Sequence, residues 1–198
     1  TSDRGLSILA QLFALCGVGM TLATFSLWWL NGTTVELGDS LSGLGDLLMA
    51  LACCVVAGLI LTYRPRHRIG WLLLTIGLLW ATEWFGEAYS RYAYITQGEE
   101  LPAAAFLQWL SSLTWVPGFG LVIWLILLFP TGRPLSPRWG WIGIAATILT
   151  VPVQVLFGIV SWPLRGPQLL ALLYDESLPP INEANQNYFA LINSPIGV

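Results

Sequence analysis

The chain has 198 residues, of which 56% are hydrophobic and only 10% are charged, and its formal net charge is −3. A soluble domain carries roughly a quarter charged residues, so this composition indicates a protein whose surface faces lipid rather than water. All eight basic residues are arginines, and they form no run that could neutralise a phosphate backbone, which argues against nucleic acid as a partner. The three cysteines lie in apolar runs without metal-ligand spacing, and we interpret them as small packing residues.

Five apolar segments follow one another along the chain, and each is long enough to cross a hydrocarbon core of about 30 Å as a helix. They are 5–30, 44–63, 69–90, 103–129 and 139–162. No alternation of period two persists over successive segments, which disfavours a membrane barrel. The sequence therefore predicts an all-α, polytopic membrane protein with a five-helix transmembrane domain over residues 1–162.

The first segment is too long for a cleaved signal peptide, so we expect it to be retained as a span. Prolines 117 and 152 each predict a kink in their segment. Asp46 follows a pair of glycines and is expected to be a charge at the start of the second helix. Residues 163–198 are expected to form a tail with short interfacial helices, and the closing residues 193–198 resemble the lead-in to a further span.

The arginines are distributed unequally over the two sides that this topology defines. Six lie before the first segment or in the second and fourth connections, whereas Arg91 and Arg165 lie on the other side. Arginine-rich connections stay in the cytoplasm, and tryptophans at the segment ends mark both interfaces. We therefore expect a multi-pass protein of the bacterial cytoplasmic membrane, with its N-terminus inside and its C-terminal tail outside.

The fourth connection belongs to the stretch 128–141, LFPTGRPLSPRWGW, which predicts a tight turn at the cytoplasmic interface. Proline cannot continue a helix, and glycine permits a sharp reversal of the chain. Arginine side chains can sit among anionic headgroups. The residues expected to form this turn are Pro130, Gly132, Arg133, Pro137 and Arg138.

The third segment holds the most unusual set of polar residues in the chain. Glu83, Glu87 and Arg91 are spaced four apart and therefore share one helix face. Glu83 lies about 21 Å from the cytoplasmic end of the segment, at 1.5 Å per residue, in the outer half of the bilayer. A carboxylate at that depth is costly unless it is neutral, paired or hydrated, so it is a candidate functional residue.

Two interpretations of this set remain open. In the first, carboxylates, aromatic rings and an amide at similar depth form an outward-opening pocket for a lipid-like or amphipathic ligand or a quinone. The residues of this predicted pocket are Glu83, Glu87, Trp80, Trp84, Tyr89, Gln108 and Trp115. In the second, Glu87 and Arg91 form a structural pair, and Glu83 is hydrogen-bonded to a neighbouring helix.

No catalytic set, phosphate-binding loop or metal cluster is visible in the sequence, so we expect a chain without enzymatic activity of its own. The single histidine, His67, lies in the second connection, so histidine ligation of haem or chlorophyll within the spans is excluded. Lipid, quinone, carotenoid or chlorophyll held by packing remain candidate cofactors.

Several stretches of the chain resemble the N-terminal membrane region of a group of bacterial multi-span sensor histidine kinases. They are 68–74 (RIGWLLL), 86–94 (GEAYSRYAY), 115–118 (WVPG) and 128–139 (LFPTGRPLSPRW), with 193–197 (NSPIG) as a looser match. The resemblance implies a sensory membrane input module, which in such proteins precedes a cytoplasmic dimerisation helix and an ATP-binding domain. Neither part is present in this chain, so the kinase activity is not carried over.

Two functions are consistent with these observations. A sensory module would belong to a longer polypeptide and form a homodimer. An accessory subunit of a respiratory or photosynthetic complex would instead join other membrane chains and pack against lipid, quinone or pigment. The turn at 128–141 and the carboxylate–aromatic cluster in the third segment favour the sensory module, and the lack of a catalytic motif favours the accessory subunit.

Overall fold

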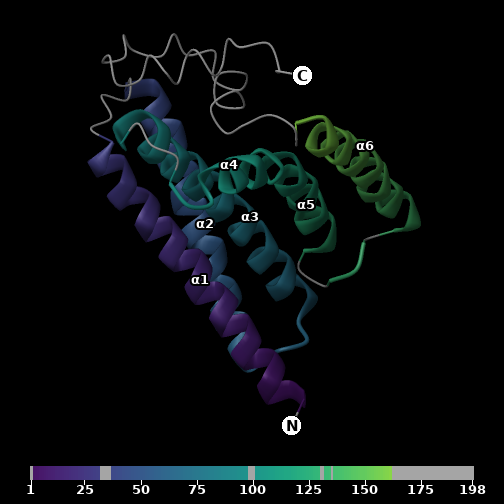
Figure 1. Cartoon of the computed structure of the whole chain (residues 1–198). Helices are drawn as coiled ribbons and strands as arrows, with labels where there is room; N and C mark the ends of the chain where they lie inside the picture. The colour runs from purple at the N-terminus through teal and green to yellow at the C-terminus, as the bar shows by residue number, and fades with distance from the viewer. Residues whose placement is uncertain (1, 32–36, 98–100, 130–131, 135, 162–198) are drawn as a thin grey trace.

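The structure is a computed structural model that describes residues 2–31, 37–97, 101–129, 132–134 and 136–161. Within these residues every regular element is a helix (Figure 1). In chain order they are α1 (Ser2–Leu30), α2 (Leu37–Tyr63), α3 (Arg68–Arg91), the π-helical turn η1 (Tyr92–Gln97), α4 (Ala104–Ser112), α5 (Trp115–Leu128) and α6 (Pro137–Ser161). The predicted all-α fold is therefore confirmed for the described part of the chain.

The described helices are compatible with the predicted membrane character. Four of them are long and apolar enough to cross a bilayer, and a fifth span results if α4 and α5 are counted together. Large apolar side chains face outward along α1, α2 and α6, for example Leu15, Leu59 and Leu149, which are 67%, 59% and 69% exposed. Such an outer surface is costly in water and is suited to hydrocarbon.

The chain reverses direction after α1, after α2, between α3 and α4, and after α5, whereas α4 continues into α5 through a bend of 42° (Figure 1). An ion pair of 2.9 Å between Asp3 and Arg66 joins the start of α1 to the connection between α2 and α3. Gly132, in the connection between α5 and α6, lies against the side chain of Arg68. Arginines 4, 64, 66, 68, 133 and 138 thus lie towards one end of the molecule, which we call the arginine end.

The opposite end is closed by contacts between α1 and the top of α3. Asn31, directly after α1, donates from Nδ2 to the carbonyl oxygen of Ala88 at 3.1 Å. Thr96 in η1 donates from its hydroxyl to Oδ1 of Asn31 at 2.9 Å. Helices α1, α2 and α3 pack on one another, α4 and α5 pack on α3, and α6 packs mainly on α5 at the side of the molecule (Figure 1).

Small residues allow the first three helices to approach closely. A Cβ atom on Gly77 of α3 would lie 2.6 Å from Cys54 Sγ and 3.0 Å from the carbonyl oxygen of Ala50, both on α2. A Cβ atom on Gly17 of α1 would lie 2.5 Å from the same sulfur. Cys54 is fully buried, so its predicted role as a small packing residue is confirmed.

The second helix begins earlier than predicted, at Leu37 instead of residue 44. The apolar segment marks only the part of a helix that can lie in lipid. The helical backbone can extend beyond that segment until a residue such as proline ends it, and no proline occurs between 37 and 44. Asp46 therefore lies more than two turns inside α2, and its predicted role as a charge at the helix start is wrong.

The fourth predicted span is broken into α4 and α5, whose axes differ by 42°. The break lies at Leu113 and Thr114, ahead of the kink expected at Pro117. The hydroxyls of Ser111, Ser112 and Thr114 donate to the carbonyl oxygens three residues earlier, at 2.8, 2.7 and 2.8 Å, and so satisfy the last carbonyls of α4.

Proline 117 lies in the first turn of α5, where a missing N–H leaves no intrahelical bond unmade. It therefore belongs to the start of a new helix instead of kinking a continuous one, and the predicted position of the kink is wrong. Helix α6 runs through Pro152 from Pro137 to Ser161. The predicted tail over 163–198 lies outside the described residues.

Candidate functional site

The carboxylates that the sequence singled out lie on one face of α3. Arg91 Nε donates to Glu87 Oε1 at 3.1 Å, and the two side chains are only 24% and 15% exposed. The predicted Glu87–Arg91 pair is therefore confirmed. Glu83, one turn earlier, is half-buried, and the carboxylates of Glu87 and of Asp46 on α2 lie close enough to act on its charge. Three acidic groups, two on α3 and one on α2, and one arginine thus lie in the same part of the molecule.

Trp84 forms an aromatic contact beside these carboxylates. Its ring meets that of Trp28 on α1 edge to face, with centroids 5.8 Å apart and planes at 86°. Gly43 of α2 lies beneath both rings, because a Cβ there would be 3.0 Å from Trp84 and 3.2 Å from Trp28. The indole N–H of Trp84 is buried and makes no hydrogen bond within the described residues.

Two other aromatic residues of the predicted pocket point elsewhere. Trp80 is only 4% exposed and belongs to an apolar cluster, with its Nε1 2.7 Å from the position of a Cβ on Gly118 and its ring 6.0 Å from that of Phe119. Tyr89 stacks on Phe85 at 6.0 Å and donates its hydroxyl to the Pro102 carbonyl oxygen at 3.0 Å. Trp80 thus packs against α5, and Tyr89 bonds to the segment before α4.

Gln108 is fully buried in α4, and neither its amide oxygen nor its amide nitrogen has a hydrogen-bond partner among the described residues. The adjoining backbone of α4 packs tightly on α3, because a Cβ on Gly86 would lie 2.6 Å from the Leu107 carbonyl oxygen. The hydroxyl of Ser90 on α3 lies at the same contact, 2.7 Å from the Gly86 carbonyl oxygen and 3.2 Å from that of Ala104 on α4. The side chain of Trp115, the last predicted pocket residue, lies outside the described part.

An amide buried without a partner costs about 1–3 kcal/mol, so such groups in native proteins normally bond to something. Gln108 and the indole N–H of Trp84 therefore offer one amide and one donor to a water molecule or to the polar part of a ligand. Both groups and Glu83 lie towards the end opposite the arginines, Trp84 on the side of α3 that faces α1 and α2, and Gln108 on α4, which packs on another side of α3. We call these three residues the polar zone.

The predicted turn is formed at the arginine end. Gly132 has φ +73°, which suits glycine, and its N–H donates to the Leu128 carbonyl oxygen at 2.7 Å, which closes the C-terminus of α5. Arg133 and Arg138 are exposed, and Pro137 is the first residue of α6. Pro130 and the side chain of Pro137 lie outside the described residues.

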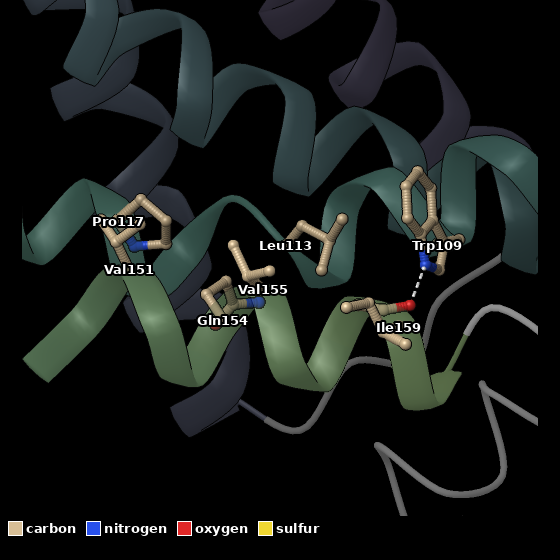
Figure 2. A pocket seen from close by; sticks show the side chains of 8 residues that line it. Trp109, Leu113, Pro117, Val151, Gln154, Val155 and Ile159 are labelled. Atoms are coloured by element: carbon tan, nitrogen blue, oxygen red, sulfur yellow. Dashed lines mark hydrogen bonds between the residues drawn. The ribbon is translucent and has the colours of Figure 1, made fainter.

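A groove between α6 and the α4–α5 break was not predicted from the sequence (Figure 2). Its volume is about 610 Å³, and almost all of its walls are apolar. The residues that line it are Trp109, Leu113, Pro117, Val151, Gln154, Val155, Gly158 and Ile159. Such a groove accommodates a hydrocarbon chain or an isoprenoid tail more readily than a polar molecule.

Two hydrogen bonds tie α6 to this groove. Trp109 Nε1 donates to the Gly158 carbonyl oxygen at 3.0 Å (Figure 2), and Gln154 Nε2 donates to the Ser112 carbonyl oxygen at 2.6 Å. Ser112 is the last residue of α4, so Gln154 satisfies one of the carbonyls that the break leaves free. An isolated glutamine within the apolar run 142–160 was the signal that could have identified this contact.

No group of three or more metal-ligating side chains occurs within the described ranges. Comparison with protein-family models, with curated proteins and with solved structures gives no significant match to this chain.

Proposed function

We propose that the chain is a non-catalytic membrane module that detects an amphipathic or lipid-like ligand and passes the signal along its helices, as a sensory input domain does. The observation that supports this proposal is the polar zone of Glu83, Trp84 and Gln108, buried or half-buried between helices that are otherwise apolar. The resemblance of residues 64–141 to the membrane regions of sensor histidine kinases points in the same direction.

The helices around this zone offer a route for the signal. Helix α3 reaches from the polar zone to the arginine end, and α4 is joined to α5 through the 42° break at Leu113 and Thr114. A ligand that bonds to Gln108 would favour one position of α4 relative to α3. Movement of α4 would then change the angle at the break, and α5 would transmit the change towards the arginine end.

Glutamate 83 provides the first test of this proposal. In the Glu83→Gln variant we expect decylubiquinone or lysophosphatidylcholine, titrated in mild detergent, to quench or shift tryptophan fluorescence at least fivefold more weakly than in the wild-type protein. Asp3→Asn is the matched control, because Asp3 is an exposed carboxylate at the arginine end. Unchanged titration curves in Glu83→Gln for every probe that binds the wild type would refute a ligand role for this residue.

A second candidate function is that of an accessory subunit in a larger respiratory or photosynthetic complex. The groove beside α6 favours it, because a volume of about 610 Å³ with apolar walls suits the tail of a quinone, a carotenoid or a lipid. In that case the chain would hold such a molecule between itself and neighbouring membrane proteins.

Extraction of the native protein in mild detergent distinguishes the two functions. For a sensor we expect a polypeptide well above 21.7 kDa, the mass of the present sequence, that elutes alone or as a homodimer. For an accessory subunit we expect a polypeptide near that mass in a fixed ratio with other membrane proteins. Intact-mass spectrometry of the eluted complex measures both the chain and its companions.

A further inference from the structure

A second groove lies at the arginine end, between α2, α3 and α5, and the proposed function makes no use of it. Its volume is about 490 Å³. The residues that line it are Val56, Ile60, His67, Ile69, Leu73, Leu125, Ile126 and Phe129. Seven of these eight side chains are hydrocarbon, and the eighth, His67, belongs to the connection that closes the end of the groove.

His67 is held in place by the start of α3. Its Nδ1 accepts the N–H of Gly70 at 3.4 Å, so the imidazole proton is carried on Nε2, where it is available as a donor. The rest of the connection is fixed by Trp71, whose indole N–H donates to the Pro65 carbonyl oxygen at 2.7 Å. These hydrogen bonds preorganise the mouth of the groove.

Several arginines lie close to His67 along the chain or contact its neighbours. Arg68 directly follows His67, Arg64 lies three residues before it, and both are exposed. Gly132 lies against the side chain of Arg68, because a Cβ on Gly132 would be 3.8 Å from the Cβ of Arg68, and this contact brings the exposed Arg133 to the same place. Asp3 is the single acidic residue that the described helices place at this end, and it pairs with Arg66.

We propose that this groove binds one anionic phospholipid of the bilayer. An acyl chain lies along the apolar walls between α2, α3 and α5, and the phosphate bonds to His67 Nε2 with Arg64, Arg68 and Arg133 around it. The apolar walls suit the acyl chain of such a lipid, and the hydrogen-bond donor and arginines suit its phosphate. A zwitterionic headgroup would bring an additional positive charge to a site that is already positive. The inference holds for either candidate function.

Native mass spectrometry of the full chain tests this proposal. The protein is purified in a neutral detergent and titrated with phosphatidylglycerol or phosphatidylcholine of identical acyl chains. We expect one phosphatidylglycerol to bind at least fivefold more tightly than phosphatidylcholine. In Arg68→Gln this preference should fall to less than twofold, whereas Arg138→Gln should retain it, because Arg138 belongs to α6, which contributes no residue to the groove.

A second variant tests the acyl-chain part of the site separately. Val56 lines the groove and is 44% exposed, so Val56→Phe narrows the groove without filling the interior of the protein. We expect this variant to weaken phosphatidylglycerol binding at least threefold. Its thermal unfolding midpoint should stay within about 2–4 °C of that of the wild type, which is the shift that a stability change of about 1 kcal/mol produces in a chain of this size.

Three outcomes would overturn the proposal. Equal affinity for the two lipids would show that the arginines do not select a headgroup. An undiminished preference in Arg68→Gln would place the selective site elsewhere. Glycerol phosphate that competes as well as the intact lipid would show a phosphate site that makes no use of the groove.

Discussion

At the scale of single residues, two ion pairs of the described helices and connections occupy contrasting surroundings. The Arg66–Asp3 pair is 72% and 62% exposed, whereas the Arg91–Glu87 pair is 24% and 15% exposed. Exposed pairs contribute about 0–1 kcal/mol, because water already solvates each partner. A shielded carboxylate that loses its partner retains the full cost of its desolvation, and Glu87 also has Glu83 one turn away.

We therefore expect Arg91→Gln to lower the free energy of unfolding by about 1–3 kcal/mol and Arg66→Gln by less than about 1 kcal/mol. Thermal unfolding in mild detergent, followed by circular dichroism, measures both variants. The double variant Arg91→Gln with Glu87→Gln should regain part of the loss, because it removes the unpaired charge. Equal effects of Arg91→Gln and Arg66→Gln would mean that the pair on α3 is as well solvated as the one at the surface.

The spacing of the residues predicted some of these contacts and not others. Residues four apart on a helix share a face whatever the tertiary structure, so the Glu87–Arg91 pair could be predicted from the sequence alone. Which neighbour covers each face depends on how the helices pack. For that reason the positions of Trp80 against α5 and Tyr89 against Pro102 could not be predicted, although both residues belong to α3.

At the scale of elements, the difference between what the sequence determines locally and what packing determines also explains how the predicted spans compare with the observed helices. Composition located the four long apolar helices and the stretch that forms α4 and α5, because hydropathy averages over about 20 residues. The end of a helix depends on local bonds, which is why α2 begins at Leu37 and why hydroxyls, rather than Pro117, mark the break in the fourth span. The groove beside α6 is a consequence of this break and was therefore not predicted.

Helix α6 depends on a small number of polar contacts with α4 and α5. We expect Gln154→Leu to lower the free energy of unfolding by about 1 kcal/mol, the usual size of a side-chain hydrogen bond within a membrane, because the Ser112 carbonyl oxygen loses its donor. Gln11→Leu is the control, since the bond of Gln11 to Thr62 lies at the exposed surface. A loss in Gln154→Leu no larger than in Gln11→Leu would show that apolar packing alone holds α6 in place. The thermal unfolding midpoint in mild detergent is the measurement.

At the scale of the whole molecule, the two ends differ in charge. Six arginines and Asp3 lie at the arginine end, whereas Glu83, Glu87 and Asp46 lie towards the other end with Arg91. The positive-inside rule predicts that the first of these ends lies in the cytoplasm. This assignment would expose the polar zone of the proposed sensor to the outer half of the membrane and would place the proposed phospholipid site in the inner leaflet.

Single cysteines introduced at the two ends test this orientation in bacterial spheroplasts. Gln97 in η1 and Pro134 after α5 are both exposed and lie at opposite ends of the molecule, so Gln97→Cys and Pro134→Cys form a matched pair. With the three native cysteines replaced by alanine, we expect a membrane-impermeant maleimide to label Gln97→Cys in intact spheroplasts and Pro134→Cys only after lysis. Labelling in the reverse order would place the arginine end outside, and the proposed ligand would then have to reach Glu83 from the cytoplasm.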